Sequence, residues 1–382
     1  MKIGIDARMY GPKVGGGGLG RYVEQLVTKL QEIDQENRYI LFLKKENFDL
    51  CKITNKNFEK RLTDIHWYTL NEQKFLPKII DQEKLDLLHF PHWNVPLFVR
   101  TPFVVTIHDL ILLDDPSSAK ATTLGFVKYA LKRLGYRAVL WNAINRSQRI
   151  ISVSHATELS ILKHFPKVDP KKIKMIYEGV TSFPYPENHG SNQGWQSLQP
   201  PLPPPTFLYI GNSYPHKNLK TLLKAFKIFH QKFSKSRLVL AGGQNIFSEI
   251  VKKYVTNINI PKEAVEFVNN PDDQKISELY SQANLYIFPS KLEGFGLPGL
   301  EAMAAGVPVI AARAGSLPEV LGEAAVYFDP NSAIELAETM EKIWCDKNQK
   351  TKMISLGFEQ IKKYSWQKMV EEIAMVYCGV CH

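Results

Sequence analysis

The stretch SKLEGFGLPGLEAMAAGVPVIAA, residues 290–312, decides how the later part of the chain folds. Three glycines and one proline lie between its two glutamates, Glu293 and Glu301. Pro298 suits the first turn of a helix, and Gly306 suits the position just after its end. The pattern therefore predicts a loop that carries Glu293 and then a helix that carries Glu301 about one turn inside it.

Two carboxylates in this arrangement suit the binding of a nucleotide-sugar. The loop glycines leave backbone N–H groups open, and the start of a helix favours an anion such as a diphosphate. Glu293 can accept hydrogen bonds from sugar hydroxyls, and Glu301 can hold a ribose diol with both oxygens. Taken as isolated residues, the two glutamates are equally well explained as solvated acids of a loop and a helix surface.

Outward from this stretch, strands alternate with helices on both sides of a proline-rich break at residues 181–205. The break holds seven prolines and no regular period, which predicts an exposed linker. The alternation predicts an α/β protein with two doubly wound, Rossmann-like domains that face each other across a cleft, with ligands beyond the carboxyl ends of the strands. We expect the domains at 1–180 and 206–364, with a C-terminal helix at about 365–382 that packs back on the first. The expected strands are 2–6, 38–43, 85–90, 102–108 and 149–153, then 206–211, 237–241, 264–268, 284–288 and 307–311, and the later helices are 217–232, 272–282, 298–305 and parts of 331–377.

Composition is typical of a soluble globular protein rather than a membrane-spanning protein. The 382 residues are 44% hydrophobic, and no run of 18 apolar residues occurs in the sequence. The first residues, MKIGIDARMYG, do not form a signal peptide, so we expect the four cysteines to be reduced in the cytoplasm. The net charge of +10 favours anionic partners.

A glycine-rich segment, YGPKVGGGGLGRYVEQL at residues 10–26, follows the first strand and opens the first helix, expected from about Leu19. Its glycines allow a close approach of the backbone to a phosphate, although a plain flexible loop explains them as well. The segment is not a dinucleotide fingerprint, because no acid follows about 20 residues on to hold a ribose. It also lacks the lysine and hydroxyl residue of a Walker loop.

The string from Glu293 to Glu301, with Ala302, Gly306 and Pro308 after it, resembles the signature of the family-four retaining glycosyltransferases, which share the GT-B fold and include bacterial mannosyltransferases. The resemblance spans nearly the whole chain. Other segments that carry it are GGLGRYV at 17–23, TIHDL at 106–110, IYEGV at 176–180, YIGNSYPHKNL at 209–219 and GSLPEV at 315–320.

The resemblance implies a set of donor-binding residues. In the family the first glutamate of the pair binds the donor sugar and the second binds the ribose, so these roles fall to Glu293 and Glu301. Lys217 matches the family's phosphate-binding lysine, and Gly18 would offer its N–H group to the diphosphate. The further donor-binding positions are Gly17, Gly211, Asn212, Gly294, Phe295, Gly296 and Leu297.

Three histidines and a tryptophan complete the implied site. His108, in the family's "HD" pair, would contact the donor sugar near the reacting carbon and would be catalytic together with Glu293 and Lys217, although a lone histidine is more often structural. His89, His92 and Trp93 follow another strand. They either line the acceptor site or simply pack around the tryptophan.

One position departs from the family. Arginine usually follows the glycine of the 206–211 strand, but this chain has Asn212, which removes a positive charge from the leaving diphosphate. A protonated His216 would compensate. The departure leaves the donor's identity and the stabilisation of the leaving group open.

Residues 125–150 predict a basic amphipathic helix. No acid occurs from residue 116 to residue 157, while seven residues there are basic. This helix is either an ordinary surface helix with a basic solvated face or an interfacial helix at anionic lipid. Its expected apolar face is Val127, Leu131, Leu134, Ala138 and Trp141, and its basic side is Lys128, Lys132, Arg133 and Arg137.

The resemblance implies that a hexose is transferred with retention from a nucleoside-diphosphate sugar to a saccharide or lipid-linked saccharide in cell-surface polysaccharide synthesis. The first candidate donor is GDP-mannose, which supplies mannose. UDP-glucose and UDP-N-acetylglucosamine are alternative donors. A sugar-nucleotide epimerase of the same fold and a non-catalytic nucleotide-sugar-binding protein stay open as alternatives, whereas a nicotinamide dehydrogenase is disfavoured by the missing ribose acid. The resemblance implies no metal, no cofactor and no nucleic-acid partner. We expect a cytoplasmic protein, and any membrane contact should be peripheral, at the inner face of the membrane.

Overall fold

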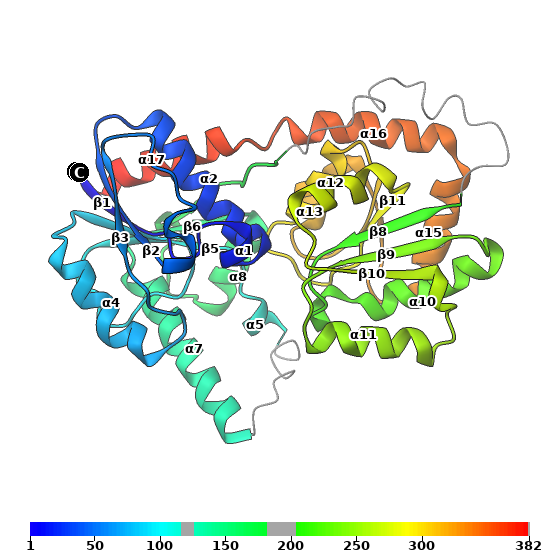
Figure 1. Ribbon diagram of the computed structural model, residues 1–382, viewed down its shortest axis with the longest axis horizontal. Coiled ribbons are helices and arrows are strands. Elements are labelled where there is room, and N and C mark those ends of the chain that lie inside the picture. The colour runs from blue at the N-terminus through cyan, green and yellow to red at the C-terminus, as the bar shows by residue number, and fades with distance from the viewer. Residues whose placement is uncertain (116–125, 182–203, 381–382) are drawn as a thin grey trace. The chain divides into compact units, whose positions relative to one another are not determined.

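The computed structural model describes residues 1–115, 126–181 and 204–380 of the chain. Most of the expected linker, residues 182–203, lies outside the described residues. The chain forms two compact α/β units, each drawn in Figure 1.

Unit 1 is built from residues 1–114, 119–179 and 365–382, and unit 2 from residues 115–118 and 180–364. The last helix of the chain thus belongs to the same unit as the first strand. None of the helices in the described residues is long and apolar enough to cross a membrane.

Unit 1 contains a sheet of seven parallel strands in the order β3-β2-β1-β4-β5-β6-β7. Its central strands carry continuous apolar runs because helices cover both faces of a parallel sheet. The strands are β1 (Lys2–Asp6), β2 (Arg38–Leu43), β3 (Phe58–Leu62), β4 (Leu87–Phe90), β5 (Phe103–Ile107), β6 (Arg149–Ser152) and β7 (Ile173–Met175). The helices are α1 (Pro12–Gly15), α2 (Gly17–Ile33), α3 (Lys45–Phe48), α4 (Leu70–Gln82), α5 (Ile111–Asp114), α7 (Phe126–Arg146), α8 (His155–His164) and α17 (Trp366–Val380).

The core of unit 1 joins segments from both ends of the chain. Side chains such as Phe42, Leu88 and Val105 are fully buried in one cluster. The C-terminal helix α17 packs against α2 and buries one apolar face in the same unit. The buried residues of that face are Trp366, Met369, Val370, Ile373 and Tyr377.

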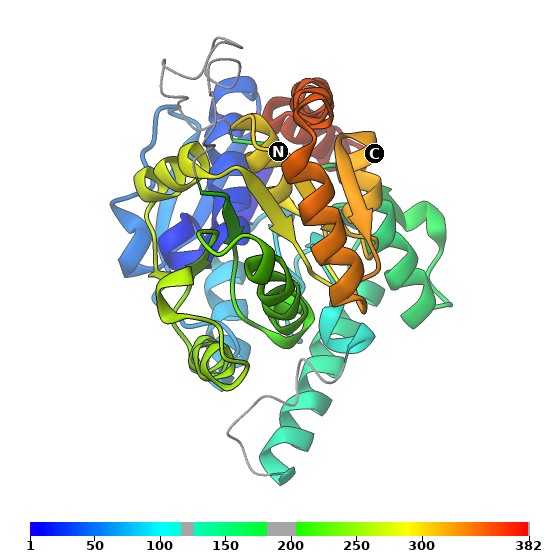
Figure 2. The same ribbon diagram turned by 90° about the vertical axis from the view of Figure 1, so that its right-hand side faces the viewer.

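Unit 2 contains six parallel strands in the order β10-β9-β8-β11-β12-β13. Its helices cover the sheet, as Figures 1 and 2 show from two directions. The strands are β8 (Thr206–Ile210), β9 (Arg237–Gly242), β10 (Val265–Asn269), β11 (Leu285–Phe288), β12 (Val309–Ala312) and β13 (Ala325–Phe328). The helices are α10 (Leu219–Lys232), α11 (Ile246–Asn257), α12 (Asp273–Gln282), α13 (Leu297–Ala304), α14 (Leu317–Leu321), α15 (Ala333–Cys345) and α16 (Lys347–Ile361).

Several helices begin where a polar side chain caps the first turn. The side chains of Thr69, Ser154, Asn245, Asp272 and Ser332 each accept a backbone N–H group from the first turn of the helix that follows. Such caps satisfy N–H groups that have no partner within the helix and therefore fix where it starts.

Two doubly wound parallel domains were predicted from the sequence, and the structure confirms this fold class. In each sheet the strand order reverses once, between β1 and β4 in unit 1 and between β8 and β11 in unit 2. Ligands of such sheets bind beyond the carboxyl ends of the strands at this reversal. The site residues are therefore sought in the loops that follow these strands.

Candidate active site

In unit 2 the loops after β8 and β11 bring two predicted site residues together. Lys217 ends a short 3₁₀ turn, Pro215–Lys217, that follows β8, and Glu293 lies in the loop that follows β11. The Nζ atom of Lys217 lies 2.6 Å from Oε1 of Glu293, and the two side chains are only 15% and 10% exposed. Because β8 and β11 are neighbours, the sheet itself creates this pair.

The turn around Glu293 is held in shape by a serine of the later sequence. The hydroxyl of Ser316 donates to the backbone oxygen of Glu293 at 3.1 Å and to that of Phe295 at 2.8 Å. Gly296 caps α13 with a φ of 111°, a conformation that a side chain would strain. The predicted segment Gly294, Phe295, Gly296 and Leu297 thus forms a fixed entry into α13.

Glu301 lies in the second turn of α13 and is buried. The Tyr280 hydroxyl donates to Oε2 of Glu301 at 3.3 Å and to the backbone oxygen of Pro298 at 3.0 Å. The tyrosine therefore links the carboxylate to the first turn of its own helix. The sequence placed Glu301 on this helix but gave no sign of Tyr280.

Two buried tyrosines fix the loop that carries Gly211 and Asn212. The Tyr209 hydroxyl donates to the backbone oxygen of Asn212 at 2.6 Å, and the Tyr286 hydroxyl donates to that of Ile210 at 3.1 Å. Burial raises the pKa of both tyrosines well above 10, and the charge of Glu293 raises it further. Both hydroxyls therefore stay protonated and keep these hydrogen bonds.

His216 does not replace the charge lost at Asn212. Its ring is buried, and burial followed by the charge of Lys217 lowers its pKa to about 4. The imidazole is neutral at neutral pH, so the suggested compensation by a protonated His216 is not supported. Asn212 instead uses its side-chain oxygen to accept the N–H group of Tyr214 at 3.3 Å.

In unit 1 the glycine-rich segment forms two helices rather than one loop. Helix α1 ends at Gly15, Gly16 reverses the chain with a φ of 78°, and α2 begins at Gly17, two residues earlier than predicted. Gly17 and Gly18 therefore lie in the first turn of α2, where backbone N–H groups have no partner within the helix. Gly18 is exposed at this helix start.

His108 follows β5 and lies between two hydrogen-bond acceptors. Its Nδ1 atom lies 2.9 Å from Oε1 of Glu178, and its Nε2 atom lies 3.0 Å from the backbone oxygen of Pro91. The ring of Tyr22 meets it edge-on, with centroids 4.7 Å apart. Both ring nitrogens of His108 therefore already have partners within the protein, and any contact with the donor sugar must be made by this fixed ring.

His89 is fully buried inside unit 1. Its ring nitrogens bond to the Tyr377 hydroxyl at 2.6 Å and to the Thr106 hydroxyl at 2.9 Å. Burial and the charge of His108 lower its pKa to about 3, so the ring is neutral. Of the two roles considered for His89, this geometry favours packing, because no part of the side chain is open to an acceptor.

His92 and Trp93 belong to a group of aromatic rings beyond β4. Trp93 lies 5.4 Å from the ring of Tyr68 and 4.7 Å from that of Tyr136, and His92 lies beside Trp93. Nδ1 of His92 accepts the N–H group of Asn94 at 3.3 Å. Both His92 and Trp93 are partly exposed, which is compatible with either packing or acceptor contact.

A buried ion cluster at the end of β1 was missed in the sequence. The Arg8 guanidinium donates to both carboxylate oxygens of Asp6 at 2.7 Å and to Glu72 at 2.6 Å, and the Asn94 side chain donates to both oxygens of Glu72. Burial lowers the pKa of Arg8, but Asp6 and Glu72 raise it by more than burial lowers it, so the arginine stays charged. The cluster ties the loop after β4 to the start of α4 and so fixes the loop that holds His92 and Trp93.

No group of three or more His, Cys, Asp or Glu side chains within residues 1–115, 126–181 and 204–380 could hold a metal ion. Within unit 2, Lys217 and the backbone N–H groups at the start of α13 are the groups suited to an anion.

Comparisons with known proteins agree with this architecture. Residues 16–182 match the family model described as Glycosyltransferase Family 4, and residues 195–360 match the model described as Glycosyl transferases group 1. An O-antigen chain mannosyltransferase of Salmonella typhimurium is 26% identical over 326 residues, 83% of this chain and 84% of that protein.

Solved structures share the fold over almost the full length. An Anabaena protein solved in complex with UDP and glucose superposes with a TM-score of 0.73 at 18% identity, covering 99% of this chain and 100% of that one. WaaG, a glycosyltransferase involved in lipopolysaccharide biosynthesis, gives 0.73 at 15% identity, covering 98% and 99%.

Two Rossmann-like domains with these matches define a glycosyltransferase of the GT-B class. The chain belongs to the family-four glycosyltransferases, as its sequence predicted.

Proposed function

We propose that this enzyme transfers a hexose, with retention, from a nucleoside-diphosphate sugar to a saccharide or lipid-linked saccharide during the synthesis of a cell-surface polysaccharide. The observation that carries the proposal is the Lys217–Glu293 pair at the carboxyl ends of β8 and β11. A cation and an anion side by side suit a ligand with a diphosphate at one end and sugar hydroxyls at the other.

The chemistry follows from the charges that develop as the sugar–phosphate bond breaks. Negative charge gathers on the diphosphate, where Lys217 and the N–H groups at the start of α13 stabilise it. The Glu293 carboxylate accepts hydrogen bonds from the sugar hydroxyls, and Glu301 accepts those of the ribose. In unit 1, the N–H groups of Gly17 and Gly18 are suited to the same kind of anion.

Mannose from GDP-mannose is the first candidate donor, supported by the mannosyltransferase relative. The Anabaena structure is described with UDP and glucose, which supports UDP-glucose as the second candidate. The nucleotide base and the sugar of the donor are therefore the first features to determine.

A thermal-shift panel of GDP-mannose, UDP-glucose and UDP-N-acetylglucosamine tests the donor. A ligand at 100 times its Kd stabilises the folded state by about 2.7 kcal/mol, so the true donor raises Tm clearly above the others. We expect Glu293→Ala to abolish this shift and transfer while the protein stays folded, and Glu263→Ala, an exposed glutamate of unit 2, to change neither. Wild-type turnover in Glu293→Ala would remove the role given to Glu293.

Product analysis separates transfer from the alternatives. Transfer yields a glycosylated acceptor and a nucleoside diphosphate, whereas an epimerase isomerises the donor sugar without an acceptor. A non-catalytic binding protein shows the thermal shift but neither transfer nor donor hydrolysis.

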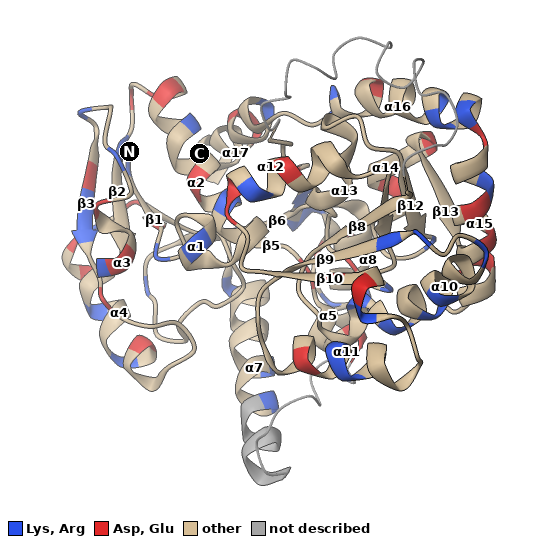
Figure 3. Cartoon of the chain, turned by 45° about the vertical axis from the view of Figure 1, so that its right-hand side comes forward, with Lys and Arg blue, Asp and Glu red and all other residues tan. Residues whose placement is uncertain are grey.

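We further propose that the enzyme contacts an anionic membrane surface through α7 and the groove beside it. In the expected apolar face of α7, Leu134 and Trp141 are not buried but 67% and 58% exposed, while Leu140 and Ile144 pack into the core. In Figure 3, the part of α7 that is not drawn in grey carries blue segments of Lys or Arg and no red segments of Asp or Glu. The side chains of residues 125–132, which include Val127, Lys128, Leu131 and Lys132, lie outside the described residues.

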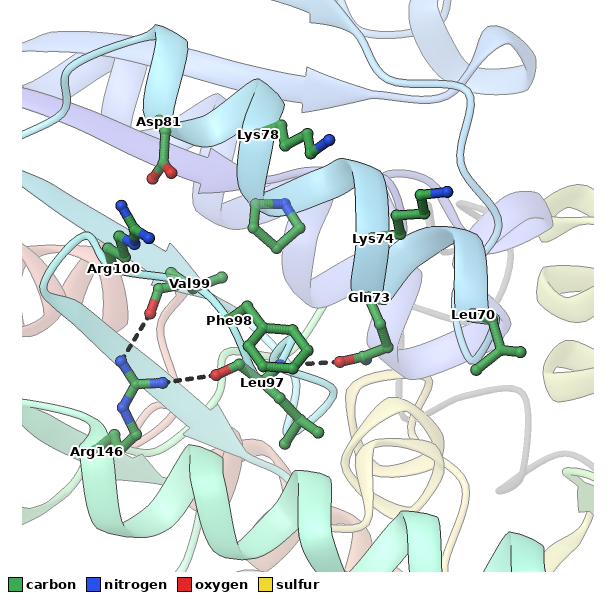
Figure 4. A pocket seen from close by; sticks show the side chains of 11 residues that line it. Leu70, Gln73, Lys74, Lys78, Asp81, Leu97, Phe98, Val99, Arg100 and Arg146 are labelled. Atoms are coloured by element: carbon green, nitrogen blue, oxygen red, sulfur yellow. Dashed lines mark hydrogen bonds between the residues drawn. The ribbon is translucent and has the colours of Figure 1, made fainter.

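The groove lies between α4 and residues 97–100 and has a volume of about 650 Å³. Figure 4 shows that Arg146, at the end of α7, donates to the backbone oxygens of Leu97 and Val99, each at 2.7 Å. Lys74, Lys78 and Arg100 line the same groove as the exposed Leu70 and Phe98, and Asp81 is the acid among the lining residues. Exposed apolar side chains among cations are typical of a surface that enters the headgroup region of a bilayer.

Liposome sedimentation tests this contact. Each lysine near an anionic bilayer contributes about 1 kcal/mol, so Lys74→Gln with Lys78→Gln should weaken binding to phosphatidylglycerol vesicles roughly 30-fold at low salt. The pair Lys347→Gln and Lys352→Gln, which removes the same charge from α16, should not weaken binding. Equal recovery of the wild-type protein in the supernatant with anionic and neutral vesicles would contradict the proposal.

A further inference from the structure

The contacts of His108 restrict what its ring can do in the reaction. The backbone oxygen of Pro91 can only accept a hydrogen bond, so the Nε2 atom, 3.0 Å away, must carry a proton. The Nδ1 atom lies 2.9 Å from the carboxylate of Glu178, which accepts when it is ionised. With an ionised Glu178, both ring nitrogens donate, which is the hydrogen-bond pattern of an imidazolium.

We propose that Glu178 is a positioning residue that holds His108 as a fixed imidazolium, so that His108 serves in transfer as a hydrogen-bond donor and a cation and not as a base. The inference rests on the proposed function and on the role expected of His108 at the donor sugar. Glu178 follows β7, in the segment after the short strand Ile173–Met175, and is buried.

The surroundings of His108 agree with a positive ring. Burial lowers the pKa of His108, but the hydrogen bond and charge of Glu178 raise it more, and the net pKa lies above 6.5. Asp109, the next residue, also raises it. Burial, and then the charge of His108 itself, lower the pKa of the neighbouring His89 and His92 to about 3, so these rings add no competing charge.

The orientation of the ring is fixed as well as its charge. Tyr22 of α2 meets the ring edge-on, and its hydroxyl bonds to the Thr106 hydroxyl at 3.0 Å. Thr106 also bonds to His89, and the Thr157 hydroxyl donates to the backbone oxygen of His108 at 3.0 Å. A substrate hydroxyl that displaces the Pro91 oxygen would meet an N–H group already in place.

A donor-only His108 has a consequence for the proton of the acceptor. As the acceptor oxygen bonds to the sugar, its proton must leave, and an imidazolium with both nitrogens protonated cannot take it. The departing diphosphate oxygen, which gains the electron pair of the broken bond, is the group that can accept this proton. Transfer should then need the protonated ring and should fall as pH rises through the pKa of His108.

Glu178→Gln tests the inference because glutamine still accepts a hydrogen bond but carries no charge. NMR titration of the histidine Cε1–H signals in the full chain, with His108 assigned by its loss in His108→Gln, measures the ring directly and needs no substrate. We expect Glu178→Gln to lower the pKa of His108, and Glu178→Asp, which keeps the carboxylate, to restore part of it. An identical titration in wild type and Glu178→Gln, or a neutral His108 at pH 7 in the wild type, would overturn the inference.

Transfer assays provide the second readout. The high-pH limb of kcat should move to lower pH in Glu178→Gln, with a loss on the order of 10²-fold at pH 8, and a limb that does not move would also overturn the inference. Glu158→Gln is the matched control, because Glu158 lies 3.0 Å from Nδ1 of the exposed His155 and should leave the limb unchanged. If no nucleotide sugar supports transfer although the NMR titration shifts as expected, the proposed function fails and the Glu178–His108 pair stands.

Discussion

At the scale of single residues, Lys217 and Glu293 stabilise each other before any donor binds. Their ion pair is mostly buried, so Lys217→Met leaves the Glu293 carboxylate without its partner and should cost about 2 kcal/mol of folding stability. The same change removes a cation from the diphosphate and should lower kcat on the order of 10²-fold.

A double variant separates these two effects. Lys217→Met with Glu293→Gln removes both charges, so urea unfolding should show most of the lost stability restored. Transfer should stay as low as in the single variants, because both the cation for the diphosphate and the negative charge of the carboxylate for the sugar hydroxyls are still missing. A double variant whose loss of stability equals the sum of the two single losses would show that the pair adds nothing to folding.

The sequence predicted candidate residues for the chemistry of the site, but it did not predict the residues that hold them in place. Glu293 and Glu301 belong to one recognisable segment, residues 290–312, and Lys217 belongs to another, residues 209–219. The structure places Lys217 against Glu293. Glu178 acts through a contact with the ring of His108, which is 70 positions away in the chain. Tyr209 acts through a hydrogen bond to the backbone oxygen of Asn212, which is 3 positions away. No periodicity marks such residues, because a single hydrogen bond leaves no repeated pattern in a sequence.

At the scale of elements, the buried strands were predicted almost to the residue. The strand expected at 38–43 is β2, and that expected at 2–6 is β1. Three strands were missed, and each lies at an edge of its sheet: β3 and β7 in unit 1 and β13 in unit 2. Edge strands are half exposed and carry charged residues, as in FEKRL of β3, so their alternation is too weak to read as a buried run.

Helix α7 shows why an amphipathic pattern does not decide which face is buried. The expected apolar face included Leu134 and Trp141, but the helix packs through Leu140, Ala143 and Ile144. Figure 1 shows the N-terminal half of α7 extending beyond the sheet of unit 1. Hydrophobic periodicity gives the faces of a helix, but the packing partner comes from the fold.

At the scale of the whole molecule, unit 1 needs both ends of the chain. Helix α17 buries five large side chains in this unit, and burying one such side chain contributes about 1.5–3 kcal/mol. The sum is on the order of 10 kcal/mol, which is similar to the net stability of a domain, about 5–15 kcal/mol.

Removal of residues 365–382 should therefore unfold unit 1 and leave unit 2 folded. Unit 2 ends at Tyr364 and contains the Lys217–Glu293 pair within its own sheet. Hydrogen exchange read by mass spectrometry should show β1, β4 and β5 losing protection in the shortened chain, while β8 and β11 keep theirs. The milder change Tyr377→Phe removes only the hydrogen bond to His89 and should leave all five strands protected. Equal protection of β1 in the shortened and full chains would show that unit 1 folds without its C-terminal helix.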